Sequence, residues 1–168
     1  VIVPYAPGGG VDPVARLVSQ KLADIWKQSV VVENKAGGSG TIGANFVAHA
    51  PSDGLTILMS ATAEVVINQH FMQKMSYNPD VDLKPVTLLV KLPFVLVTNP
   101  SKPYSTAAEL IAFAKKNPNT VTYASSGPGT PQHLAAVMLE EQAGIKLVHV
   151  PYKGVAPSVS DLLAGHVD

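Results

Sequence analysis

The sequence contains no cysteine and only one arginine, Arg16, among its 168 residues. Without cysteine the chain forms no disulfide bonds and no thiolate metal sites. Arg16 lies four residues after Asp12, a spacing at which the two side chains pair on one face of a helix. The chain therefore has no second guanidinium to clamp a carboxylate in bidentate fashion. Backbone amides, hydroxyl groups and water would have to bind such a ligand.

Charge of either sign is also scarce. Charged residues make up 14% of the chain, and twelve basic side chains balance twelve acidic ones. Without a basic cluster, the sequence argues against nucleic acid or an anionic membrane surface as a partner. The longest apolar run, from Leu88 to Val97, contains Lys91 and Pro93 and is too short to span a bilayer. The five histidines show no metal-binding spacing. With 46% hydrophobic residues, we expect a compact globular chain.

The sequence begins and ends within strand-like runs. The sequence opens on Val1 inside a strand-like run, and its last residues, Gly165 to Asp168, are typical of the beginning of another strand. No signal peptide is visible. We therefore expect this sequence to be a piece of a longer protein.

The first part of the chain alternates strands and helices. Val1–Tyr5, Val30–Val32 and Leu55–Met59 are short, apolar and typical of buried parallel strands. Each is followed by a glycine-rich or polar loop and then a helical pattern, the first with Asp12 as N-cap and Pro13 at the first helical position. Repeated strand–loop–helix units predict a parallel sheet covered by helices.

The second part repeats this plan after an apolar crossover. The segment from Lys84 to Pro103 predicts two strands and then a hinge between domains. Beyond it, Thr106 and Glu109 have the spacing of a capping box. Strands are expected at Val121–Tyr123 and Leu147–Val150, with helices from Pro131 to about Gly144 and from Pro157 to Ala164. We predict an α/β protein with two lobes, residues 1–99 and an incomplete 100–168.

Glycine-rich loops precede the first helix of each part. Gly8, Gly9 and Gly10 lead into one helix, and the loop from Ser125 to Thr130 leads into the other. Glycine lets a ligand approach the backbone closely, and a helix N-terminus offers unpaired N–H groups with positive partial charge. Each loop could be an ordinary connection, but a matching pair favours one ligand cleft shared by the two lobes.

Known phosphate and nucleophile motifs do not fit these loops. A dinucleotide fingerprint needs glycine where Pro13 stands, and the chain has no Gly-Lys-Ser/Thr triplet for a P-loop. Ser125 and Ser126 do not lie in a G-x-S-x-G nucleophile elbow. An α/β hydrolase that uses Ser125 or Ser126 with His133 stays open as an alternative function.

The motifs together resemble one family. "VPYAPGGGVDPVARLV", "VVVENKAGGSGTIGA", "PSDGLTILM", "FVLVTNP", "TYASSGPGTPQHLA" and "VHVPYKGVAPSVSDLLAGHVD" follow one another in the order found in the Bug/TctC solute receptors, which are linked to tripartite tricarboxylate transporters. The resemblance covers essentially the whole chain. It implies a periplasmic, two-lobed type II Venus-flytrap fold that captures small carboxylates or related solutes with amides and waters, and that is not an enzyme.

The resemblance also implies a set of ligand-binding residues, with Asp12 as the best candidate for a side-chain contact. It assigns a mostly structural role to Ala36–Gly40 and puts Tyr152, Lys153 and Gly154 at the rim of the cleft. The ligand-binding set is Ala6, Pro7, Gly8, Gly9, Gly10, Asp12, Ser60, Ala61, Thr62, Ala63, Glu64, Ser125, Ser126, Gly127, Gly129, Thr130 and His133.

Glu64 departs from the family pattern, in which small hydroxyl residues and a histidine stand at Glu64 and Val65. An acid in the cleft would repel a second carboxylate, which favours a monocarboxylate, an amide or an amino-bearing solute over a dicarboxylate. The alternative is that Glu64 points to solvent.

The implied partners are a small organic acid or related solute and the membrane subunits of a transporter, or a sensor kinase that reads the ligand-bound form. We expect a monomer without cofactor, metal, nucleic-acid partner or membrane-inserted segment.

Overall fold

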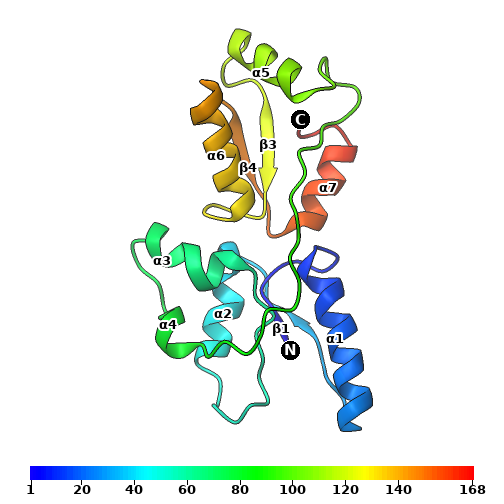
Figure 1. Ribbon diagram of the computed structural model, residues 1–168, viewed down its shortest axis with the longest axis vertical. Coiled ribbons are helices and arrows are strands. Elements are labelled where there is room, and N and C mark those ends of the chain that lie inside the picture. The colour runs from blue at the N-terminus through cyan, green and yellow to red at the C-terminus, as the bar shows by residue number, and fades with distance from the viewer.

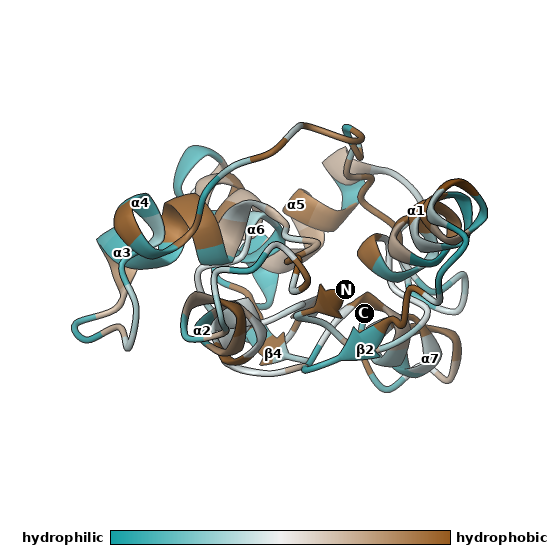
Figure 2. Ribbon diagram, turned by 90° about the horizontal axis from the view of Figure 1, so that it is seen from below, coloured by the Kyte–Doolittle hydropathy of each residue, from teal (hydrophilic) through white to brown (hydrophobic).

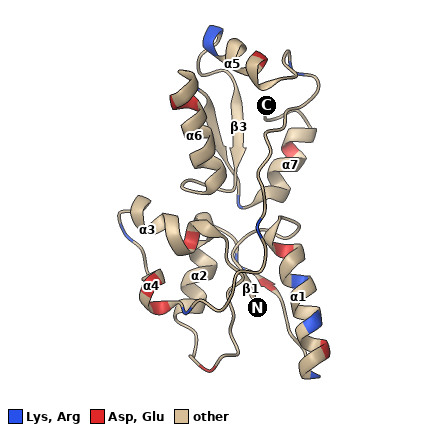
Figure 3. Cartoon of the chain, viewed as in Figure 1, with Lys and Arg blue, Asp and Glu red and all other residues tan.

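The computed structural model describes residues 1–168 and shows two bodies joined by an extended segment (Figure 1). We call the body that contains the N-terminus lobe one and the body that contains the C-terminus lobe two. No helix has the length and apolar character that crossing a membrane requires. Acidic and basic residues are scattered over both lobes without a large patch of one sign (Figure 3).

Lobe one is built around a small parallel sheet. Strand β1 (Ile2–Val3) pairs in parallel with β2 (Glu33–Asn34), and the third expected strand contributes only a single parallel bridge between Ile2 and Leu58. Helix α1 (Val11–Trp26) packs here, and buried Val3, Ala15 and Met59 form the core. The parallel pairing is confirmed, whereas the second strand begins a few residues later than expected.

The remaining helices of lobe one are short. A 3₁₀ turn, η1 (Gly38–Gly40), leads into α2 (Thr41–Ala48), and a π-helical turn, η2 (Ala63–Ile67), leads into α3 (Asn68–Phe71). Helix α4 (Pro79–Asp82) was not expected from the sequence. The 3₁₀ and π turns put the residues around Ser39 and Glu64 next to each other, since η1 and η2 are in contact.

Lobe two follows the expected order closely. Helix α5 (Ala107–Lys116) carries the capping box of Thr106 and Glu109, which is confirmed. Strand β3 (Thr122–Ser125) pairs in parallel with β4 (Val148–Pro151), with α6 (Pro131–Ala143) between them in sequence and α7 (Val155–Leu163) after them. The core comprises Tyr104, Leu110, Ala114, Val121 and Ile145.

The crossover segment contradicts the sequence prediction. Residues 84–99 form no strand, although their hydrophobic residues suggested two (Figure 2). A strand needs a neighbouring strand to accept its backbone hydrogen bonds, and none lies beside this segment. Thr98 and Asn99, placed in lobe one by the sequence, hydrogen-bond to the carbonyl oxygen of Asp168 in lobe two. The apolar side chains are correspondingly exposed at Val86, Leu88, Leu89, Val90, Leu92, Phe94, Val95, Leu96 and Val97.

Candidate functional site

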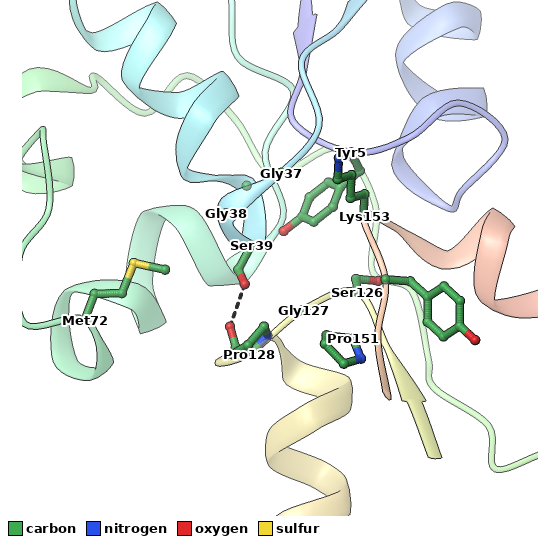
Figure 4. Close-up of a pocket in the computed structure, with 12 residues that line it drawn as sticks. Tyr5, Gly37, Gly38, Ser39, Met72, Ser126, Gly127, Pro128, Pro151 and Lys153 are labelled. Carbon is green, nitrogen blue, oxygen red and sulfur yellow. Dashed lines mark hydrogen bonds between the residues drawn. The ribbon is translucent and has the colours of Figure 1, made fainter. Parts of the chain in front are cut away.

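A pocket of about 290 Å³ lies where the two lobes meet (Figure 4). Its wall consists of backbone, hydroxyl groups and a few apolar side chains, and Lys153 is its one charged residue. It is lined by Tyr5, Gly37, Gly38, Ser39, Gly40, Met72, Ser126, Gly127, Pro128, Pro151, Tyr152 and Lys153.

The glycine turn of Gly37–Gly40 forms much of the lobe-one wall. All four of its residues have positive φ, including Ser39 at 53°, a conformation that is unfavourable for a residue with a side chain. The amide group of Asn68 donates to the carbonyl oxygen of Ser39 at 3.0 Å. The sequence interpretation of this turn as mostly structural missed its place on the pocket wall.

The second glycine loop faces this turn from lobe two. The hydroxyl of Ser39 donates to the carbonyl oxygen of Pro128 at 2.6 Å, a bond drawn in Figure 4. A Cβ atom added to Gly127 would lie 2.6 Å from Ser39 Oγ. Real Cβ atoms do not approach so closely, so glycine at position 127 is what allows the two lobes to meet here.

Asp12 has an internal role. Helix α1 begins at Val11 with Gly10 as its N-cap, so the expected N-cap role of Asp12 is wrong. Its buried carboxylate accepts hydrogen bonds from the Gly8 amide, the Arg16 guanidinium and the Asn34 side chain at 2.9–3.0 Å. The bond from Arg16 is the largest cause that lowers the pKa of Asp12 to about 2. These three donors occupy most of the hydrogen-bonding capacity of the carboxylate and leave little of it for a ligand.

The first glycine loop contacts lobe two beside the pocket. The Ala6 amide donates to the Lys153 carbonyl oxygen at 3.0 Å. A Cβ atom on Gly9 would lie 3.8 Å from the Cβ atom of Val155, at the beginning of α7. This loop therefore packs against the beginning of α7, and its part in ligand binding stays a prediction.

Glu64 is completely buried, which contradicts the alternative that it points to solvent. One carboxylate oxygen accepts the Ala61 amide at 2.6 Å, and the other accepts the hydroxyl of Tyr5 at 2.7 Å. Burial raises the pKa of Glu64, and the bonds from Tyr5 and Ala61 act against that rise. The carboxylate lies directly behind the pocket wall, since a Cβ on Gly40 would be 2.8 Å from it.

The serine and histidine residues of lobe two do not form the pair that the hydrolase alternative required. His133 Nδ1 accepts the Gly129 amide at 3.2 Å. Ser125 Oγ instead lies 2.6 Å from Nε2 of His149, whose ring stacks on Tyr123. Burial, with nearby His133, lowers the pKa of His149. Ser125 is itself buried, so its hydrogen bond with His149 stabilises the second glycine loop behind the pocket.

The structure places the predicted site residues in two groups. Ser126 and Gly127 line the pocket directly. The others surround it without lining it, in the first glycine loop, around η2 and at the beginning of α6, and their part in ligand binding stays a prediction. These are Ala6, Pro7, Gly8, Gly9, Gly10, Asp12, Ser60, Ala61, Thr62, Ala63, Glu64, Ser125, Gly129, Thr130 and His133.

Sequence reasoning left several pocket residues out of the site. The sequence pattern predicts Tyr5 as the last residue of a buried strand. No motif around Met72 or Pro151 indicates a binding site. The glycines of "AGGSG" were the one available sign, since four residues with little or no side chain in succession allow a close approach to backbone.

Comparisons with known proteins point to one group. The model of the tripartite tricarboxylate transporter family receptor (TctC) matches residues 14–168. A "UPF0065 protein in tcbD-tcbE intergenic region" from a Pseudomonas species is 44% identical over 99% of this chain and 49% of its own length. The chain thus spans about half the length of the curated relatives it matches.

Solved structures agree with this result. Rpa4515 of R. palustris with adipate is 34% identical, with a TM-score of 0.95 over 99% of this chain and 56% of that one. MatC from Rhodopseudomonas palustris with bound malate is 30% identical, with a TM-score of 0.91 over 99% and 57%. The expected α/β periplasmic binding-protein fold is confirmed by these likenesses.

Proposed function

The chain belongs to the tripartite tricarboxylate transporter receptor family, TctC, and from this premise we propose that it captures a small organic acid or related solute in the pocket between its lobes and delivers it to a transporter of the tripartite tricarboxylate type. The family is one of solute-binding receptors, not of enzymes. We place the chain in the periplasm, with lobes near residues 1–99 and 100–168 that close on the solute by a hinge motion.

The observation that carries the proposal is the meeting of two glycine turns over one pocket. Gly37–Gly40 and Ser126–Pro128 bring backbone and hydroxyl groups to opposite walls, and Ser39 bonds across to Pro128 at 2.6 Å. Polar backbone and hydroxyl groups that converge on a concave site are typical of small-molecule pockets. Adipate and malate in the similar structures are small carboxylates, and the one cation of this pocket, Lys153, suits that chemistry.

Isothermal titration calorimetry of the protein at its natural full length, with adipate, malate, matching monocarboxylates and their amides, tests the proposal. We expect stoichiometric, roughly micromolar binding of at least one probe, since a few hydrogen bonds to a charged group suffice for about 8 kcal/mol. No heat and no thermal shift with any probe would contradict it.

The Lys153→Met variant tests the pocket itself. It keeps the aliphatic stem of Lys153 and removes the ammonium group, so we expect carboxylate affinity to fall roughly tenfold or more. Lys146→Met removes a charge from an exposed lysine of the same lobe and should leave affinity unchanged. Equal affinities in the two variants would place the carboxylate elsewhere.

A further inference from the structure

The hydroxyl of Tyr5 connects the pocket to a buried acid. Tyr5 follows β1, lines the pocket and is 7% exposed, and Figure 4 shows its ring with the hydroxyl directed toward the turn at Gly38 and Ser39. The same hydroxyl lies 2.7 Å from Glu64 Oε2. A phenol has one proton to donate, so the partner that takes this proton decides what Tyr5 can offer a ligand.

In its ionised form Glu64 accepts two hydrogen bonds, and these act against the burial that raises its pKa. The Ala61 amide can only donate, and it occupies Oε1 at 2.6 Å. In the ionised form the other oxygen accepts the proton of Tyr5 at 2.7 Å. No lysine, arginine or histidine pairs with this acid. Its titratable neighbours are Tyr5 and Tyr77, whose hydroxyl donates to the Glu64 carbonyl oxygen, whereas His70 of α3 and Asp80 and Asp82 of α4 are exposed.

We propose that ionised Glu64 sets the hydrogen-bonding polarity of the pocket through Tyr5 and thereby selects the solute. With the Tyr5 proton donated to Glu64, the phenol presents only oxygen lone pairs to the pocket. The lobe-one wall then accepts a hydrogen bond from a hydroxyl, an amide N–H, an ammonium or an undissociated carboxyl group. A second carboxylate at that place would face lone pairs and a buried negative charge.

This inference deepens the proposed function and rests on it. It assigns Lys153 to a carboxylate at one end of the solute and the Tyr5 oxygen to a donor group at the other. The preferred solute class is therefore a small monocarboxylate with a second, donor-bearing polar group, rather than a dicarboxylate.

The Glu64→Gln substitution reverses the direction of the hydrogen bond between residue 64 and Tyr5. The Ala61 amide still needs an acceptor, so the glutamine oxygen takes the place of Oε1 and its NH₂ group faces Tyr5. That NH₂ group donates to the phenol oxygen, and the tyrosine proton becomes free to point into the pocket. The variant thus replaces an acceptor with a donor at the same position, without a change in side-chain length.

The experiment measures the affinities of adipate and of its monoamide at about pH 8, far above the usual carboxyl range, because burial raises the pKa of Glu64 and the test needs its ionised form. These probes match in length and differ only in the donor-bearing end. In the full-length protein we expect the monoamide to bind more tightly, and Glu64→Gln to shift the ratio of the two affinities roughly tenfold or more toward adipate. Glu141→Gln, at an exposed position of α6, is the matched control and should leave the ratio unchanged.

Tyr5→Phe completes the test, also in case Glu64→Gln does not fold. It removes the phenol oxygen and should weaken the preference for the monoamide, and in its background Glu64→Gln should no longer shift the ratio. An unchanged ratio in Glu64→Gln or in Tyr5→Phe, or a shift that persists without the hydroxyl, overturns this inference while the receptor function stands. If neither probe binds the unsubstituted protein, the proposed function fails for this ligand class and the inference fails with it.

Discussion

At the scale of the residue, the carboxylate of Asp12 holds the first glycine loop against the beginning of α1. It joins Gly8 to Arg16 and Asn34, which come from the loop, the helix and strand β2. The pairing with Arg16 was expected from the spacing of four residues and is confirmed. Asn34 could not be anticipated, because only the parallel pairing of β1 with β2 brings it beside the helix.

Asp12→Asn should therefore destabilise the protein. The folded state lowers the pKa of Asp12 from 3.8 to about 2, and each pKa unit corresponds to about 1.4 kcal/mol. We expect a loss of about 1–2 kcal/mol at neutral pH. Because the folded pKa is depressed, this stability is fully present above pH 3.8 and disappears as the pH falls toward 2.

Urea unfolding at neutral and at acidic pH measures this effect. Asp24→Asn, an exposed change on the same helix, serves as the control and should cost little at either pH. If the two variants unfold alike at neutral pH, the carboxylate of Asp12 does not stabilise the loop.

At the scale of the element, local signals in the sequence mark helix α5 but not the crossover strands. The capping box of Thr106 and Glu109 lies within four residues, and both of its bonds form. The basic residues Lys115 and Lys116 stand in the last turn, where they favour the helix dipole. The apolar run of residues 84–97 also has strand propensity, but a strand depends on a partner that local sequence does not specify.

Thr106→Ala removes the cap of α5 and should lower the free energy of unfolding by about 1 kcal/mol. Thermal unfolding measures the change. Thr62→Ala is the matched control, because Thr62 precedes η2 without a side-chain capping bond. A loss that is equal in both variants would mean that the cap contributes nothing.

At the scale of the whole molecule, closure of the lobes depends on how near their glycine turns come. Ser39 and Gly127 approach so closely that a Cβ on Gly127 would meet Ser39 Oγ at 2.6 Å, and Gly127 has a φ of 126°. Gly144 also has a positive φ, 61°, but it ends α6 with no atom within 4 Å of an added Cβ. A substitution at Gly144 therefore tests backbone strain alone, whereas the same substitution at Gly127 also tests the contact between the lobes.

Gly127→Ala should keep the lobes apart, whereas Gly144→Ala should only strain its own turn at a cost of about 1–2 kcal/mol. Small-angle X-ray scattering should show a larger radius of gyration for Gly127→Ala than for Gly144→Ala or the unsubstituted protein. Identical scattering from all three would mean that this contact does not limit closure.

The alternation of strands and helices, the α/β class, the family and the capping box could all be predicted from the sequence. These features depend on neighbouring residues or on motifs in a fixed order. The expected ligand loop at Gly8–Gly10 was inferred by the same local reasoning. In the structure Gly37–Gly40 lines the pocket and the first loop packs on α7, so the binding role of the first loop stays a prediction.

Which groups meet at the site depends on how the chain folds. Glu64 is buried against Tyr5, 59 residues away, and Ser125 pairs with His149, 24 residues away, instead of with His133. Ser39 and Pro128 meet across 89 residues. The first two contacts follow from packing within a lobe and the third from packing between the lobes, and no spacing in the chain encodes any of them. The polarity of the pocket therefore rests on contacts that only the folded chain creates.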